Sequence, residues 1–336
     1  MNKIAKTVLM TGTALCAAGV VLSTAGYFAG GKDFTYTSDH MYVSGGNSSS
    51  RKNLTVMKKE QIDDFTKLNV DFENFDLDIR TSDDDHYYME YKLEKNGRKN
   101  PLTWKDKDGE LTLEEPAGGS GSYYITYDLG IFSTHADLTE KKDALNTVVL
   151  YIPEKAQLSE AELQLSDGDL TADQILCKEM TLELLSGDLM LDKGEFEKFD
   201  AKLSDGDLNV KGLQCTDNMQ LKSGNGDVTI KKAELADGQI ALSDGDLQID
   251  NGSFNGDMKI NSSCGDVSVE MKNGSAEKTN IYLKAADGDV DTEGLSRGKT
   301  DNEEDTSVYE NKAGASAPTL NVKCSDGDIT LTESEK

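Results

Sequence analysis

The sequence predicts an all-β protein: a parallel β-solenoid (β-helix-like) with an irregular N-terminal cap, preceded by one transmembrane or signal helix. Three observations predict this fold. They are an uncharged run near the N-terminus, a Gly-Asp dipeptide that recurs every 19 or 20 residues over most of the second half of the chain, and apolar columns at fixed offsets from each dipeptide. Together they describe repeated units that share one thin core.

The N-terminal segment has the composition of a membrane-crossing helix. Residues 7–31 carry no charged side chain, and ~20 apolar residues suffice to span a bilayer core. Lys3 and Lys6 lie on the short side of this run, which favours a cytoplasmic N-terminus. We therefore expect a single-pass protein of the cell membrane, anchored through residues 7–29, with residues 32–336 extracellular. The alternative is a cleaved signal peptide and a secreted protein, because small residues end the run.

A tight turn recurs along the second half of the chain. Leaving out one out-of-phase pair at Gly256, the successive spacings of its Gly-Asp dipeptides are 19, 19, 20, 19, 20, 23 and 39 residues, the last close to two periods. Glycine supplies a positive φ, and aspartate caps exposed backbone N–H groups. The glycines of the series are Gly168, Gly187, Gly206, Gly226, Gly245, Gly265, Gly288 and Gly327.

Apolar side chains alternate with polar ones on both sides of each turn, which predicts half-buried strands. One apolar column stands two residues after each glycine: Leu170, Leu189, Leu208, Val228, Leu247, Val267, Val290 and Ile329. A second stands five residues before each glycine: Leu163, Leu182, Ala201, Leu221, Ile240, Ile260, Leu283 and Val322. A third stands four residues after each glycine and contains one polar residue, Thr292.

A unit of this length cannot bury its apolar face alone and must stack on its neighbours. One unit per rung of a parallel solenoid satisfies this need, at the ~4.8 Å spacing of paired strands. Cys177 supports the alignment, because it falls in a column with Leu158 and Phe196, although Thr216 and Asn255 break that column. Antiparallel hairpins closed by two-residue Asp-Gly turns are the rival interpretation. The constant period favours the solenoid.

The chain divides into four segments by composition. Residues 1–31 form the anchor or signal segment, and residues 32–61 a polar linker with a short helix expected from Lys58. Residues 62–157 form the irregular N-terminal β region, in which the segment ending at Thr81-Ser82-Asp83-Asp84 resembles a degenerate rung. Residues 158–336 form the β-strand repeat solenoid. Within it, the stretch 293–317 is expected to be an acidic loop that replaces part of a rung.

Charge and cysteine content exclude several classes of protein. The formal net charge of −27 disfavours nucleic acid and anionic lipid as partners, so cationic partners or metal ions fit better. Of the five cysteines, Cys16 lies in the apolar run and none forms a Cys-x-x-Cys pair, which argues against zinc. We interpret the other four as apolar fillers or as free thiols. They are Cys177, Cys215, Cys264 and Cys324.

The acid after each repeat glycine never varies, and it is the one candidate for chemistry. We expect these carboxylates to cap the turns, with calcium bound between rungs as the alternative. The candidate calcium ligands are Asp169, Asp188, Asp207, Asp227, Asp246 and Asp266. No catalytic residue and no required cofactor is predicted. A β-helix enzyme that degrades polysaccharide is the weaker alternative, because here the acids follow the repeat instead of breaking it. An aromatic patch at Trp104, Tyr123, Tyr124 and Tyr127 is a further candidate binding surface.

The pattern resembles the bacterial putative-adhesin family of β-strand repeats, a domain of unknown function in cell-envelope proteins. The residues that carry the resemblance are Val70 to Asp84, Val149 to Pro153, and the Ser-Asp-Gly-Asp ladder from Ser166 to Asp328. The resemblance implies a β-solenoid, an anchor or signal segment, no catalytic residues and, in some members, a part in sensing envelope stress. We therefore expect a non-catalytic, adhesin-like module that binds an envelope component or a partner protein.

Overall fold

The computed structural model describes residues 34–36, 41–43, 54–95, 97–117, 145–292, 295, 298–303 and 306–335. The chain divides into two units, Met1–Leu54 with Gly119–Lys141, and Thr55–Gly118 with Lys142–Lys336. In the first unit the structure describes a two-stranded antiparallel hairpin, β1 (Phe34–Tyr36) and β2 (Met41–Val43). The second unit holds the repeats. Across the described residues it is built of strands, with one 3-10 turn, η2 (Ala276–Lys278).

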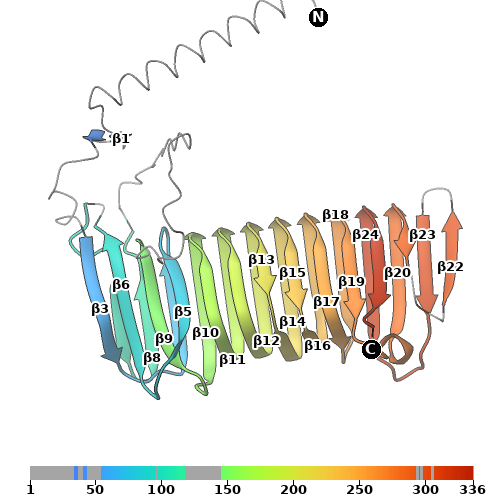
Figure 1. The fold of residues 1–336 in the computed structure, drawn as a ribbon, viewed down its shortest axis with the longest axis horizontal. Helices are drawn as coiled ribbons and strands as arrows, with labels where there is room; N and C mark the ends of the chain where they lie inside the picture. Colours follow the sequence, from blue (N-terminus) through green and yellow to red (C-terminus); the bar gives the residue numbers. More distant parts are fainter. Residues whose placement is uncertain are drawn as a thin grey trace, which may run out of the picture. The chain divides into compact units, whose positions relative to one another are not determined.

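The repeats form a parallel β-solenoid in which each rung pairs with the next in register (Figure 1). This confirms the solenoid and excludes the hairpin interpretation, since Leu170, Leu189 and Leu208 are stacked partners. The strands of these rungs are β10 (Leu158–Asp167), β11 (Leu170–Ser186), β12 (Leu189–Asp205), β13 (Leu208–Val210), β14 (Leu213–Asn225), β15 (Val228–Lys231), β16 (Ala233–Asp244), β17 (Leu247–Phe254), β18 (Met258–Cys264) and β19 (Val267–Met271).

Each rung contains three short segments that face one core. In β11 the inward alternation is interrupted at positions 173–174 and 178–179, where two successive side chains point outward and the chain turns a corner. The Gly-Asp turn makes the third corner. The predicted inward columns are confirmed: the column before each glycine is fully buried, and so is the column two residues after it, except at the partly exposed Val290. A single unit is too thin to have a core of its own, so these columns become buried only because the units stack.

The extra residue of a 20-residue rung lies in a β-bulge. The pairing of β12 with β14 shifts register between Phe196 and Lys198, and that of β14 with β16 shifts between Cys215 and Asn218. Cys215, not Thr216, therefore stacks between Phe196 and Leu235. Phe254 likewise takes the place expected for Asn255. The column that looked broken in the sequence is continuous, because bulges absorb inserted residues without changing the inward face.

At the N-terminal end, a rung of two strands lies on the first repeat. It consists of β4 (Lys67–Phe72) and β5 (Asp76–Ser82), which pair with β10 and β11 on one side. On the other side they pair with β8 (Glu110–Glu114) and β9 (Thr147–Pro153). The turn of this rung stands at residues 73–76, so the ladder position belongs to Asp76. The segment expected to resemble a degenerate rung does contain one, and Asp83 and Asp84 lie beyond its second strand.

Antiparallel strands close the N-terminal edge. β7 (Thr103–Lys107) pairs with β8, β6 (Tyr87–Glu94) pairs with β9, and β3 (Leu54–Ile62) pairs with β6. The helix expected from Lys58 was wrong, since that residue lies within β3. The sheet thus begins inside the segment assigned as linker. These antiparallel strands cover the edge of the parallel rungs, so that edge is not open to a further parallel rung.

The rungs of the C-terminal end do not stack in chain order (Figure 1). β24 (Thr319–Asp326) lies between β18 and β20 (Asn280–Asp287), and β25 (Ile329–Glu333) lies between β19 and β21 (Val290–Asp291). The strands of the last rung in sequence, β24 and β25, therefore lie between those of the two rungs that precede it in the chain. Between them in sequence, β22 (Lys299–Glu303) and β23 (Thr306–Asn311) form an antiparallel hairpin on β20. The acidic loop expected at 293–317 is largely this hairpin.

None of the residues that the structure describes belongs to a helix long and apolar enough to cross a membrane. The predicted anchor, residues 7–29, lies outside the described residues, so the anchor remains an expectation.

A candidate surface: the aspartate ladder

The glycines of the repeated turn stack directly on one another. Gly206 has a φ of +133°, a conformation that side chains rarely adopt. A Cβ atom built on Gly206 would lie 2.1 Å from the carbonyl oxygen of Gly187 on the rung below. The same close approach recurs from Gly187 through Gly265 and onward to Gly327 and Gly288. Glycine is therefore required here both by backbone conformation and by the contact between rungs.

Each aspartate of the ladder holds the next rung through its side chain. Oδ1 of Asp207 accepts a hydrogen bond of 2.8 Å from the backbone N–H of Asp227, and Oδ1 of Asp188 accepts one of 2.9 Å from Asp207. The bond repeats along the array at 2.8–3.0 Å. In stacking order the ladder runs Asp76, Asp169, Asp188, Asp207, Asp227, Asp246, Asp266, Asp328 and Asp289. The predicted role of these residues as turn caps matches this geometry.

Asp76 begins the ladder in a more enclosed place than its successors. Burial raises the pKa of its carboxyl above the ordinary value, and the charge of Asp169 adds to the rise, while the hydrogen bond from the Asp169 N–H opposes it. The hydroxyl of Thr147 donates a further bond of 3.3 Å to its Oδ2. Asp76 was missed in the sequence because Phe75 replaces the glycine that marks the other turns.

The calcium hypothesis concerns the same carboxylates. The array supplies one ladder carboxylate per rung, and one oxygen of each is already engaged by a backbone N–H. Among the described residues there is no group of three or more Asp, Glu, His or Cys side chains placed to hold a metal ion. Calcium between rungs therefore stays a prediction for experiment, and the structure assigns no ligand set to it.

The acidic column that precedes each glycine is interrupted. Asp167 and Asp205 are separated by Ser186, and Asn225 follows Asp205 in the stack. The amide of Asn225 donates a bond of 2.6 Å to Oδ1 of Asp205. Neutral residues between the acids reduce the repulsion that an unbroken column would have.

A buried carboxylate caps the turn of the first rung. Glu115, whose side chain is 1% exposed, accepts bonds from the backbone N–H groups of Glu73 (2.9 Å) and Asn74 (2.7 Å) and from Nη1 of Arg98 (2.7 Å). This cap was not predicted. Glu115 lies outside the period, so no repeat signal could identify it.

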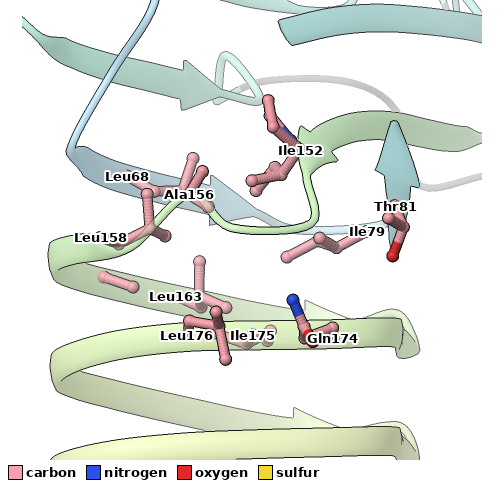
Figure 2. A pocket seen from close by; sticks show the side chains of 12 residues that line it. Leu68, Ile79, Thr81, Ile152, Ala156, Leu158, Leu163, Gln174, Ile175 and Leu176 are labelled. Carbon is pink, nitrogen blue, oxygen red and sulfur yellow. The ribbon is translucent and has the colours of Figure 1, made fainter. Parts of the chain in front are cut away.

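The best-defined cavity lies where the chain passes from β9 to β10 (Figure 2). It is lined mainly by apolar side chains, among them Leu68, Ile79, Ile152, Leu163 and Ile175, and its volume is about 10 Å³. A cavity needs ~10–15 Å³ to hold one water molecule. It is therefore a packing gap between the cap and the first repeat, too small for a ligand.

The remaining candidate residues are the predicted aromatic patch, which the structure describes only at Trp104, and the cysteines. Trp104 lies on the edge strand β7 and is 39% exposed, while Tyr123, Tyr124 and Tyr127 lie outside the described residues. The four described cysteines are free thiols; Cys264 is exposed, and the other three are buried. Burial raises the pKa of Cys177 to about 12. The buried thiols therefore act as the apolar fillers expected from the sequence.

Comparison with known proteins gives low sequence identity to solved structures. A putative cell adhesion protein from Clostridium sporogenes is 16% identical (83% of this chain and all of that chain covered, TM-score 0.27). A putative lipid binding protein from Parabacteroides distasonis is 12% identical (86% and 98% covered, TM-score 0.44). A putative adhesin from Parabacteroides merdae is 14% identical (86% and 98% covered, TM-score 0.38). No curated protein matches the chain.

The family comparison covers most of the chain. The model described as Toastrack DUF4097 matches residues 65–332, a range that begins just before β4 and ends within β25. The resemblance to an adhesin-like family of β-strand repeats of unknown function is thereby confirmed. The chain belongs to the Toastrack DUF4097 family.

Proposed function

We propose that this chain is a non-catalytic binding module of the cell envelope, anchored through residues 7–29 and exposed from residue 32 onward. The uncharged run, with Lys3 and Lys6 on its short side, supports the anchor and its orientation. The module acts in adhesion or as an accessory to envelope stress sensing. Both roles require a surface that holds a partner at a distance from the membrane.

The observation that carries the proposal is the repetition of outward positions on a hydrogen-bonded array. From β4 to β20 every rung presents its outward side chains in register with the rungs beside it. Such a surface makes many equivalent weak contacts, and multivalency adds them into useful affinity. The ladder carboxylates contribute by fixing the turns, since each accepts a hydrogen bond from the next rung.

The proposal is tested with the full chain in a bacterial host. Protease added to intact cells should remove the repeats and leave an N-terminal fragment in the membrane. The purified chain should bind envelope preparations without releasing new reducing ends. Repeats that stay intact where a surface control is digested would reject export. Release of sugar ends that Asp207→Asn abolishes in a folded protein would reject the non-catalytic role.

A calcium-stabilised surface scaffold is the second candidate, favoured by the exposed carboxylate that each rung of the ladder presents. Calcium accepts carboxylate and carbonyl oxygens in flexible geometry, whereas magnesium demands a stricter octahedron. A melting temperature raised by millimolar calcium but not by magnesium would assign the ladder to metal binding. Equal effects of the two ions would leave the aspartates as turn caps.

A further inference from the structure

The segment of each rung that precedes the Gly-Asp turn has an outward face with two central columns. On β11 these columns are occupied by Thr181 and Glu183, which alternate with the buried Met180, Leu182 and Leu184. The same two positions recur on every rung from β8 to β20 through the parallel pairing. We call this surface the pre-turn face.

In the N-terminal half of the solenoid, the lysines of the pre-turn face and of the column before it are matched by acids on the neighbouring rung. In the central columns Lys202 pairs with Glu183 at 2.6 Å. In the column before them Lys67 pairs with Glu160 at 2.6 Å and Lys198 with Glu179 at 2.8 Å. This half therefore neutralises its own cations.

The C-terminal half, from β14 to β20, is different. Its two central columns hold four lysines and no acid: Lys222, Lys259, Lys284 and Lys323. We call these four residues the lysine strip. None of them forms an ion pair with a residue that the structure describes. The other outward positions of the two columns are neutral: Gln220, Gln239, Ala241, Asn261, Asn321 and Tyr282.

Acids border the lysine strip but do not enter its two columns. Asp237 and Asp257 stand at the corner before it, where Asp237 accepts the N–H of Asp257 at 2.7 Å and Asp257 accepts the N–H of Thr319 at 3.0 Å. Asp200 stands one rung before Gln220, and Asp326 and Asp287 stand at the turn that follows the strip. At the far end, Glu310 of β23 lies beside Tyr282 and pairs with Lys312 at 3.9 Å. The strip is thus a cationic surface, without an acid in its own two columns, on a protein of net charge −27.

Two lysines of the strip lie side by side on neighbouring rungs. Lys323 of β24 is the direct register partner of Lys284 of β20. Two ammonium groups at the ~4.8 Å strand spacing repel by ~0.9 kcal/mol in water. An anion bound between them would replace that repulsion with attraction.

We propose that the lysine strip binds an anionic polymer with closely spaced phosphate or carboxylate groups. The strip crosses five rungs, or about 19 Å at the strand spacing, so it fits an extended chain better than a single anion. Neutral amides and the Tyr282 hydroxyl between the lysines donate hydrogen bonds to the same oxygens. Ala241 is its one apolar residue, and a protein partner would need more apolar area at the centre of its interface. This assignment rests on the proposed binding role and names its ligand class.

The test uses the full chain in neutral detergent with two probes, sodium polyphosphate and polygalacturonate, followed by calorimetry. The strip variant is K222Q/K259Q/K284Q/K323Q. The control variant is K178Q/K193Q/K211Q/K231Q, which changes the net charge equally but lies on other faces. We expect the strip variant to bind at least tenfold more weakly and the control to change less than twofold. Circular dichroism and the urea midpoint establish that both variants are folded.

Salt dependence gives a second readout. Four phosphate contacts release counterions with a slope of about −2.8 in log K against log salt, so doubling the salt should weaken wild-type binding about sevenfold. The strip variant should lose most of this slope. Binding of one probe only identifies phosphate or carboxylate as the source of the anion and supports the proposal.

Three results would overturn the assignment. They are a folded wild type that binds neither polymer, equal losses in the strip and control variants, and a salt-sensitive dimer that only the strip variant abolishes. The dimer would mean that the lysines meet the acidic half of a second copy. Each result would leave the envelope-binding role open, because protease treatment and envelope binding test that role separately.

Discussion

Replacing Gly206 by alanine should destabilise the array at one contact, that between Gly206 and Gly187. The new Cβ would lie 2.1 Å from the carbonyl oxygen of Gly187, far inside ordinary contact distance, and the φ of +133° disfavours any side chain. The backbone strain costs ~1–3 kcal/mol. Forcing the rungs apart adds a similar ~1–3 kcal/mol. We therefore expect a loss of about 2–6 kcal/mol from Gly206→Ala.

Gly212 provides the matched control, because it lies in the same rung as Gly206 but has neither a positive φ nor a close backbone contact. Its nearest atom to an added Cβ is the carbonyl oxygen of Asp192 at 3.5 Å, which is ordinary contact. Gly212→Ala should be neutral or should stabilise by ~0.4–1 kcal/mol, since alanine restricts the unfolded chain.

Hydrogen exchange of the full chain measures the difference locally, which matters because repeat arrays open in parts. A loss of 2 kcal/mol corresponds to about thirtyfold faster exchange where reclosing is fast and exchange reports the opening equilibrium. We expect this acceleration between residues 187 and 226 for Gly206→Ala and none for Gly212→Ala. If the two variants differ by less than threefold, steric stacking of the turn glycines does not stabilise the array.

Two further predictions concern the ladder and the thiols. Asp207→Ala removes the acceptor of the Asp227 N–H and should cost ~1 kcal/mol in urea unfolding, whereas Asp207→Asn keeps an acceptor and should cost less than half as much; equal losses would contradict the hydrogen-bond role. At pH 8, iodoacetamide should modify the exposed Cys264 of the folded chain, while Cys177, buried and with its pKa raised to about 12, should react only after unfolding. Rapid modification of Cys177 detected by mass spectrometry would show that its rung opens.

The period and the inward columns could be predicted because burial by stacking acts on every rung alike. Leu170, Leu189 and Leu208 occupy equivalent places, so the same selection for an apolar side chain appears three times in the sequence. The ladder aspartates were recognised for the same reason, since each meets the same N–H donor on the rung beside it.

Features that depend on one local environment left no such repeated signal. Cys215 entered its column through a bulge, and the sequence shows only that the rung is one residue longer. Asp76 joined the ladder although Phe75 stands in the glycine position. Glu115 caps a turn from outside the repeat, where its partners Glu73 and Asn74 are more than forty residues away.

The order of the last rungs could not be predicted, because stacking columns make rungs interchangeable. Leu283 and Val322 both satisfy the column before the glycine, so either rung can pair with Ile260. In either order β20 and β24 are neighbours, so Lys284 and Lys323 remain register partners and the lysine strip stays continuous. The observed order places Lys323, instead of Lys284, beside Asn261. It also leaves one edge of β20 to the hairpin strand β23, whereas stacking in chain order would give that edge to β24. The core thus permits both arrangements, and the difference between them lies in the pairing of the hairpin that precedes the last rung.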